Sequence, residues 1–423
     1  MMSKNLQRLL FGKFCSLFAA SLFTFVAGLT VLRETSSGLQ FALVLIAGTV
    51  PRIILSPVAG VLADRWNRKK IIVLTETFSA LTLTVFAGYA FFFPIHTLHY
   101  MIVSAILTSL STFLSVTLMS SLTRLLEETE LQRGNSLIST ISSISSIGAP
   151  MLAGFLLSFA PIDLFSLLPL TLFALAAIWN TRLTFRVLPS SAETTASFLT
   201  DFRDGYRYVF KQRLLTTLIM MALVLNFFFI AFEVMYPIIL LDRLSFSPFQ
   251  FGVIEAVLGV GLLISSLLLA LPRFTIKRPL LTVFQSLILL GVFFIIPILP
   301  LLGLIPVSWS FAYFFLFSFI EGFLVLRANI PLQLIVQRRT DPAYLGRVIG
   351  VMESLAMGIM PLGMLLFGYL SDYVSLSLLF SISSFGLLLT VGSGMFVLRR
   401  DLQAERSEQN PSLETEKTST SAS

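Results

Sequence analysis

Charged residues are scarce in this sequence, and so are the residue types that most often bind metals or carry redox chemistry. Only 12% of the 423 residues are charged, whereas a soluble domain carries about 25%. The single cysteine, Cys15, excludes a disulfide or a cysteine-based metal site within the chain. The two histidines, His96 and His99, lie in a short segment that lacks further metal ligands. We therefore expect no metal site and no cofactor.

Long apolar runs dominate instead. The composition is 56% hydrophobic with a mean hydropathy of +0.90, more apolar surface than a soluble core could absorb. Twelve runs are long enough to cross a hydrocarbon core of about 30 Å, which takes about 20 residues. They cover approximately 9–32, 38–63, 71–93, 100–122, 135–159, 164–181, 214–241, 248–271, 280–302, 309–334, 348–370 and 376–398. The strands of a membrane barrel alternate apolar and polar residues, and these runs show no such alternation. We therefore predict that the runs are helices in a lipid bilayer.

The basic residues are distributed unevenly between the two sides of the membrane. When the N-terminus is cytoplasmic, 25 of the 29 Lys and Arg fall in inside segments. This positive-inside pattern predicts that both termini are cytoplasmic. The expected location is the plasma membrane, as in a bacterial cell. The net charge of +7 is thereby explained by topology, so we expect no nucleic-acid partner. The first run is too long for a typical signal peptide and is read as an uncleaved span.

The spans divide into two groups of six. We predict an N-terminal six-helix bundle over 1–182, a cytoplasmic linker over 183–213, a C-terminal six-helix bundle over 214–400 and a disordered cytoplasmic tail over 401–423. The linker should contain an amphipathic helix on the inner membrane surface, with one face formed by Phe198, Phe202, Tyr206 and Phe210. The fold class is thus an all-α integral membrane protein with 12 transmembrane helices. Such six-plus-six repeats are typical of transporters with a substrate site between the halves.

The segment GVLADRWNRKK, residues 60–70, lies between the second and third spans. It resembles the loop signature of the major facilitator superfamily, and the matching positions are Gly60, Asp64, Arg65, Arg68 and Lys69. Asn67 replaces the glycine usual before the second arginine, and it also tolerates a left-handed turn. The resemblance implies a cytoplasmic gate that latches the two halves together. Plain topology anchoring would explain the bases but not Gly60 and Asp64 at their spacing.

The fifth span carries a second pattern. The superfamily's exporters have a glycine and proline motif there, and this chain places small residues in register at Ser136, Ser145, Ala149, Pro150, Ala153 and Gly154. Small side chains allow close helix packing and the proline bends the helix, so generic packing is the alternative. Together with the linker DFRDGYRYVFK, the chain resembles the drug-exporter branch that includes macrolide-efflux and enterobactin-exporter proteins. One departure is Thr108, which stands where many family antiporters have an arginine that takes part in proton coupling.

Several ionisable residues fall inside predicted spans. Each costs about 2.5–3.5 kcal/mol at the centre of an inserted helix, so such groups normally face a cavity or one another. Depth along the helices predicts a central substrate and proton-coupling site at Arg52, Glu233 and Glu321, with Glu255 as an outer candidate. A static ion pair of Arg52 with a glutamate is the alternative. Near the inner face, we assign Glu76, Glu127 and Glu353 to the cytoplasmic gate.

These features favour a secondary-active exporter of small amphipathic molecules, drug-like or macrolide-like, that works by alternating access with proton antiport. The excess of acids over bases in the spans hints at a cationic or neutral substrate. The alternatives are an importer or exporter of a dedicated metabolite, siderophore or lipid-like substrate, and a non-transporting membrane sensor or assembly partner. We do not expect an enzyme, because the chain has no HExxH or GxSxG motif. The expected partners are a small-molecule substrate, protons and lipid, and the expected oligomeric state is a monomer.

Overall fold

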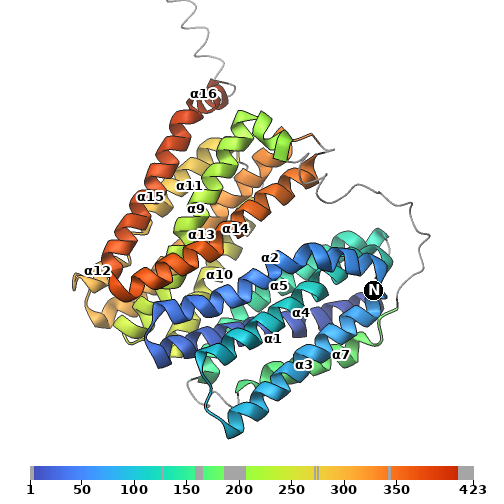
Figure 1. The fold of residues 1–423 in the computed structure, drawn as a ribbon. Helices are drawn as coiled ribbons and strands as arrows, with labels where there is room; N and C mark the ends of the chain where they lie inside the picture. Colours follow the sequence, from blue (N-terminus) through green and yellow to red (C-terminus); the bar gives the residue numbers. More distant parts are fainter. Residues whose placement is uncertain are drawn as a thin grey trace, which may run out of the picture. The chain divides into compact units, whose positions relative to one another are not determined.

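The structure is a computed structural model that describes residues 4–125, 128–157, 165–184, 206–270, 273, 276–341 and 344–407. Every secondary-structure element in these ranges is helical (Figure 1). Within the described residues, eleven helices are long and apolar enough to cross a membrane, and they correspond to eleven of the predicted runs. The sixth predicted run appears as the shorter helix α7, Leu167–Asn180, of 14 residues. The all-α membrane fold predicted from the sequence is confirmed.

The chain divides into two compact units. Unit 1 contains residues 1–193, 233–259 and 364–374, and unit 2 contains residues 194–232, 260–363 and 375–423. Two segments of the predicted C-terminal bundle therefore belong to unit 1, because they pack on its helices. The predicted bundle boundaries around residues 183–213 remain a prediction.

Unit 1 is built around α1. Its full helices are α1 (Lys4–Thr35), α2 (Gly38–Arg65), α3 (Arg68–Phe92), α4 (Thr97–Leu125), α5 (Glu128–Leu157) and α7. Helix α1 packs against α2, α4, α5 and α7, and α3 packs against both α4 and α7. Because α1 is contacted from several sides, its buried residues include small ones such as Ala19 and Ala27, which pack with Phe23, Phe86 and Phe173. Apolar burial on most faces explains why this stretch reads as continuously apolar.

Unit 2 is held together by aromatic side chains. Its helices are most of α9 (Arg213–Pro237), the end of α10 (Pro248–Ala270), α11 (Pro279–Phe293), α12 (Ile298–Leu301), α13 (Val307–Arg339), most of α14 (Leu345–Tyr373), α15 (Leu376–Val397) and α16 (Arg399–Ser407). The Phe232 ring stacks on Phe294 at 4.7 Å and meets Phe380 edge-on at 5.6 Å. Phe317 stacks on Phe293 at 4.8 Å. These ring pairs join α9, α11, α13 and α15 into one core.

Two predicted polar regions differ from expectation or lie partly outside the described residues. Of the linker, residues 206–211 are helical, and the exposed Tyr206 and Phe210 rings lie 4.3 Å apart with their planes tilted by 33°. Val209 is buried in the core of unit 2, whereas Phe198 and Phe202 lie outside the described residues. The tail, predicted to be disordered from Asp401, is instead helical as far as Ser407. The reason is a tertiary contact, since the Glu405 carboxylate accepts hydrogen bonds from the amides of Leu280 and Leu281 at 2.9 and 3.0 Å.

Candidate functional site

A cavity of about 420 Å³ opens in unit 1. Its walls come from α1, α2, α5, the end of α9 and the beginning of α10. The lining residues are Ala20, Ser21, Thr24, Phe25, Gly28, Leu29, Phe41, Leu45, Pro150, Glu233, Pro237, Phe251 and Glu255. The cavity therefore lies where helices of the predicted N-terminal bundle meet segments of the predicted C-terminal bundle, all within one compact unit.

Two carboxylates line this cavity. The Glu233 side chain is exposed and that of Glu255 is half-buried, and their charges are close enough to repel each other. Pro237 lies four residues after Glu233 and has no N–H group, so it cannot bond the Glu233 carbonyl. The chain continues from Pro237 as the π-helix η1, Ile238–Arg243. The proline thus interrupts regular helix bonding beside an acidic group that faces the cavity.

The remaining walls are mainly apolar and aromatic. The Phe25 ring on α1 stacks on Phe251 of α10 with centroids 5.5 Å apart and planes at 15°. The Thr24 hydroxyl donates to the Ala20 carbonyl at 2.9 Å, which uses its proton within the helix and leaves its oxygen able to accept. Stacked rings beside two carboxylates suit a molecule with an apolar body and a cationic or hydrogen-bonding group.

The predicted central residues are brought together only in part. Glu233 and Glu255 share the cavity, whereas Arg52 and Glu321 are not among its lining residues. Arg52 is exposed on α2 and lies within electrostatic reach of Lys13, a buried base on α1 that was not singled out from the sequence. Glu321 is buried in unit 2, on α13. Thr108 is half-buried on α4.

The 60–70 segment forms the end of α2 and the beginning of α3. Asn67 is in extended backbone with φ −66°, and its side chain caps α3 by accepting from the Lys70 amide at 3.2 Å. Its role is therefore a helix N-cap and not the left-handed turn considered from the sequence. Arg68 donates to the Ala63 carbonyl at 2.9 Å and Lys69 is half-buried. Among the described residues, no atom beyond the neighbouring helix backbone lies within 4 Å of a Cβ placed on Gly60. The side chains of Asp64 and Arg65 lie outside the described part.

Glu76, assigned to the gate from the sequence, makes its hydrogen bonds inside unit 1. Its carboxylate accepts from the Ser16 hydroxyl of α1 at 2.7 Å and from the Asn180 amide of α7 at 2.8 and 3.0 Å. The side chain is completely buried. It therefore ties α3 to two neighbouring helices. The two other acids assigned to the gate, Glu127 and the side chain of Glu353, lie outside the described part.

The small residues of α5 do allow close helix packing. Ala149 and Ala153 are fully buried, and Ser145 is nearly so. A Cβ on Gly154 would overlap the Pro248 carbonyl oxygen at the start of α10, and one on Gly252 would lie 2.6 Å from the Pro150 carbonyl oxygen. Backbones of α5 and α10 thus touch directly. The Ser136 side chain lies outside the described part, and Gly252 was not noticed in the sequence.

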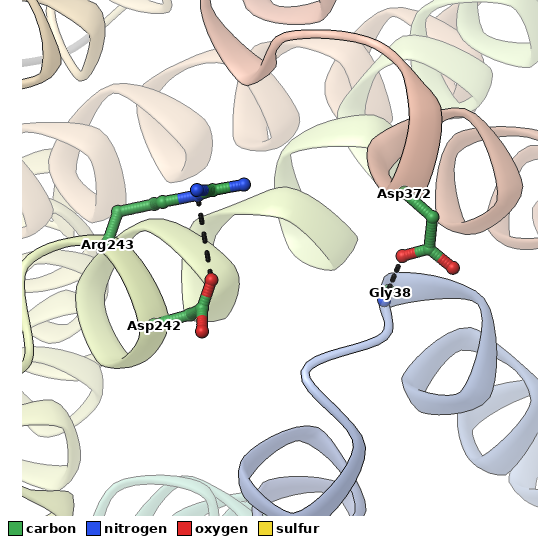
Figure 2. Close-up of polar contacts among 4 residues, drawn as sticks. All are labelled: Gly38, Asp242, Arg243 and Asp372. Atoms are coloured by element: carbon green, nitrogen blue, oxygen red, sulfur yellow. Dashed lines mark hydrogen bonds and ion pairs between the residues drawn. The ribbon is translucent and has the colours of Figure 1, made fainter.

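A further contact in unit 1 joins the start of α2 to the end of α14 (Figure 2). The Asp372 carboxylate accepts from the Ser37 hydroxyl at 2.7 Å, the Gly38 amide at 2.6 Å and the Leu39 amide at 3.4 Å. It thereby satisfies N-terminal amides of α2, where the helix dipole favours an anion. Sequence reasoning missed it, although GVLAD (60–64) and GYLSD (368–372) share one Gly-x3-Asp spacing that could have drawn attention to it.

Comparisons with known proteins agree with this architecture. Residues 9–361 match the family model described as Major Facilitator Superfamily. The chain is 27% identical over 393 residues to the multidrug efflux pump Tap of Mycolicibacterium fortuitum, covering 87% of this chain and 90% of that protein. It is 24% identical over 374 residues to macrolide efflux protein A of Streptococcus pyogenes, covering 88% of this chain and 90% of that protein.

A solved structure matches at the level of the fold. The crystal structure of the nucleoside transporter NupG superposes with a TM-score of 0.66 at 15% identity, covering 94% of this chain and 99% of that one. The resemblance to the drug-exporter branch, expected from the loop, the fifth span and the linker, is confirmed by the efflux-pump relatives. The chain belongs to the major facilitator superfamily and is a multi-pass membrane transporter, not an enzyme.

Proposed function

We propose that this transporter exports small amphipathic molecules and that the unit 1 cavity is its substrate site. The observation that carries the proposal is the pairing of two carboxylates, Glu233 and Glu255, with the stacked Phe25 and Phe251 rings in one cavity of about 420 Å³. Aromatic walls suit the apolar body of a drug-like molecule, and the carboxylates suit a cationic group. The relatives described as multidrug and macrolide efflux proteins support the same assignment.

The carboxylate pair also supports proton antiport. Two neighbouring negative charges in a cavity walled by apolar helices attract a cation, and either a proton or a cationic substrate can satisfy them. Competition between the two for one site couples their movements, because loading protons favours substrate release. This supplies a coupling site in a chain where Thr108 replaces the arginine seen in many family antiporters. Glu321, a buried acid inside a membrane-spanning helix of unit 2, is a second candidate for proton binding.

Alternating access needs contacts that can open and close on each side of the cavity. We assign the outer gate to the α2–α14 contact through Asp372 and the α5–α10 contact through Gly154 and Gly252. Both lie at helix ends that the positive-inside pattern places outside. The inner gate is assigned to the 60–70 segment, together with Glu127 and Glu353. Rocking of residues 1–182 against 214–400 would exchange the two gates.

A susceptibility and dye-efflux panel tests this function. The gene is returned to a deletion strain, and resistance to macrolides and cationic dyes is measured with and without an uncoupler. We expect raised resistance and dye efflux that the uncoupler abolishes. If no compound is handled differently, the assignment as a drug exporter is wrong, and a dedicated metabolite, siderophore or lipid-like substrate is favoured. Efflux that persists with the uncoupler would contradict proton coupling but not the assignment as an exporter.

A further inference from the structure

A second cavity, of about 600 Å³, lies in unit 2. It is formed by the end of α10, the segment leading into α11, α11 itself and the middle of α13. Its lining residues are Leu268, Leu269, Ile276, Lys277, Arg278, Leu281, Thr282, Gln285, Phe323 and Arg327. It shares no lining residue with the carboxylate cavity of unit 1, and the transport mechanism proposed above does not use it.

Among the described residues that line this cavity, three are bases and none is an acid. Lys277 is exposed, whereas Arg278 and Arg327 are half-buried. Arg327 lies well inside the membrane-spanning helix α13, where a charge is costly unless an anion or a set of acceptors faces it. The lining of this cavity is therefore strongly positive.

The protein satisfies Arg327 only in part. Its Nη1 atom donates to the Ser286 hydroxyl at 2.9 Å, and that hydroxyl donates in turn to the Thr282 carbonyl at 2.8 Å. A guanidinium has five N–H donors. Within the described part of the chain, this is the one hydrogen bond found for the Arg327 side chain, and no carboxylate forms an ion pair with it. Donors therefore remain for a ligand in the cavity.

The carboxylate of Glu405 lies at the start of α11 but does not line the cavity. It accepts from the Leu280 and Leu281 amides, so it is already engaged as the cap of that helix. Among the described residues no acid faces Arg327 in an ion pair, so a group that enters the cavity is suited to neutralise its charge. Guanidinium and ammonium groups together are suited to the several oxygens of a phosphate, which accept from more than one donor at once.

We propose that this cavity binds a phosphate group, with Arg327 and Arg278 contacting its oxygens and Lys277 at the rim. Two sources have this chemistry, the headgroup of an anionic phospholipid and a soluble phosphate compound. The apolar walls at Leu268, Leu269 and Phe323 suit an acyl chain. The basic segment 273–278 lies on the side predicted to be cytoplasmic, where basic pockets between transmembrane helices bind anionic headgroups.

Thermal unfolding of the purified full-length protein in detergent tests the proposal. The probes are phosphatidylglycerol, phosphatidylcholine with the same acyl chains, and inorganic phosphate. Binding to the folded state raises Tm, because it stabilises that state by RT ln(1 + L/Kd), where L is the free ligand concentration. We expect phosphatidylglycerol to raise Tm by several degrees and phosphatidylcholine to have little effect. Arg327→Gln and Lys277→Gln should each remove most of that shift, whereas Arg339→Gln, an exposed arginine at the end of the same helix, should keep it.

Each outcome either identifies the source of the phosphate group or contradicts a phosphate site in this cavity. A Tm shift with inorganic phosphate but not with phosphatidylglycerol, lost in the same variants, assigns the site to a soluble phosphate compound. Equal shifts with both phospholipids that the variants do not reduce, or a phosphatidylglycerol shift that survives in Lys277→Gln, overturn the proposal. So does the lack of any shift in the wild-type protein when native mass spectrometry also detects no retained phospholipid. Because Lys277 is exposed, its variant tests the site even if Arg327→Gln fails to fold.

Discussion

At the scale of single residues, the buried carboxylate of Glu76 makes the most sharply testable stability contribution. Replacing Glu76 with alanine leaves the Ser16 hydroxyl and the Asn180 amide buried without their acceptor, at a cost of about 1–3 kcal/mol for each unsatisfied group. Glutamine keeps one acceptor oxygen. We therefore expect Glu76→Ala to lower Tm in detergent by several degrees and Glu76→Gln to lower it less.

The control for that measurement is Asp242→Ala, which removes an exposed acid that pairs with Arg243 at 3.5 Å. Exposed ion pairs contribute about 0–1 kcal/mol, so this variant should unfold within a degree or two of the wild type. Equal Tm values for Glu76→Ala and Asp242→Ala would contradict the structural role assigned to Glu76.

Part of the candidate site could be predicted from the sequence. Glu233 and Glu255 could be singled out because charge inside an apolar span is costly, and that rule does not depend on knowing the fold. The rule does not say which charges share a cavity. It grouped Glu321 and Arg52 with Glu233 by depth along separate helices, whereas the lining of the cavity also depends on how each helix is rotated about its axis. Lys13 and Asp372 were overlooked because one reads as an anchor and the other as a loop acid.

At the scale of elements, direct backbone contact between α5 and α10 is the feature most sensitive to side-chain volume. A Cβ on Gly154 would overlap the Pro248 carbonyl oxygen, which is backbone and cannot move aside as a flexible side chain could. Overpacking of this kind costs about 1–3 kcal/mol or more. We expect Gly154→Val to reduce dye efflux at least about tenfold in cells with matched protein levels.

Gly88→Val on α3 is the matched control, because no described atom beyond the neighbouring helix backbone lies within 4 Å of a Cβ at that position. It introduces the same side chain into another membrane-spanning helix where there is open space. Normal efflux by Gly154→Val, or equal losses in the two variants, would show that α5 and α10 do not depend on this close approach.

The α2–α14 contact is the second element-scale feature with a clear test. Asp372→Ala removes an acceptor of three hydrogen bonds at the start of α2, each net favourable by about 0.5–1.5 kcal/mol. If this contact is an outer gate, its loss should open the cavity to the outside. In a Cys15→Ser background, we expect a Thr24→Cys probe on the cavity wall to react about tenfold faster with a membrane-impermeant maleimide, which corresponds to about 1.4 kcal/mol.

Asp242→Ala again supplies the control, since Asp242 also lies near the predicted outer end of its helix but pairs with Arg243 (Figure 2). Its labelling rate should equal that of the parent protein. An unchanged rate in Asp372→Ala would remove this contact from the gating scheme.

Helix positions could be predicted from the sequence far better than contacts between helices. Continuous apolar runs identify spans because every backbone group in lipid must be bonded within its own helix. Apolar runs do not predict α16, because Arg399–Ser407 has a polar composition. This helix is stabilised by the contact of Glu405 with the start of α11. Contacts between distant segments of this kind leave no periodic pattern for the sequence to display.

At the scale of the whole molecule, the uneven distribution of Lys and Arg predicts the orientation of the chain. We expect a C-terminal fusion to green fluorescent protein to fluoresce, because that protein folds in the cytoplasm, and a C-terminal fusion to alkaline phosphatase to be inactive. A phosphatase fusion placed after residue 95, in the predicted first half of an outside loop, should be active. The opposite pattern would invert the inner and outer assignments of both gates.

At this scale we propose that substrate and protons compete for the unit 1 cavity. The most direct measurement is proton-driven uptake of a cationic dye into everted membrane vesicles containing the Glu233→Gln/Glu255→Gln variant, compared with the wild type and with Asp242→Asn. Loss of charge-assisted contacts worth about 1.5–3 kcal/mol each should lower uptake at least about tenfold, with normal protein levels and wild-type activity in Asp242→Asn. Full proton-driven uptake by the double variant would show that substrate and protons do not compete at Glu233 and Glu255.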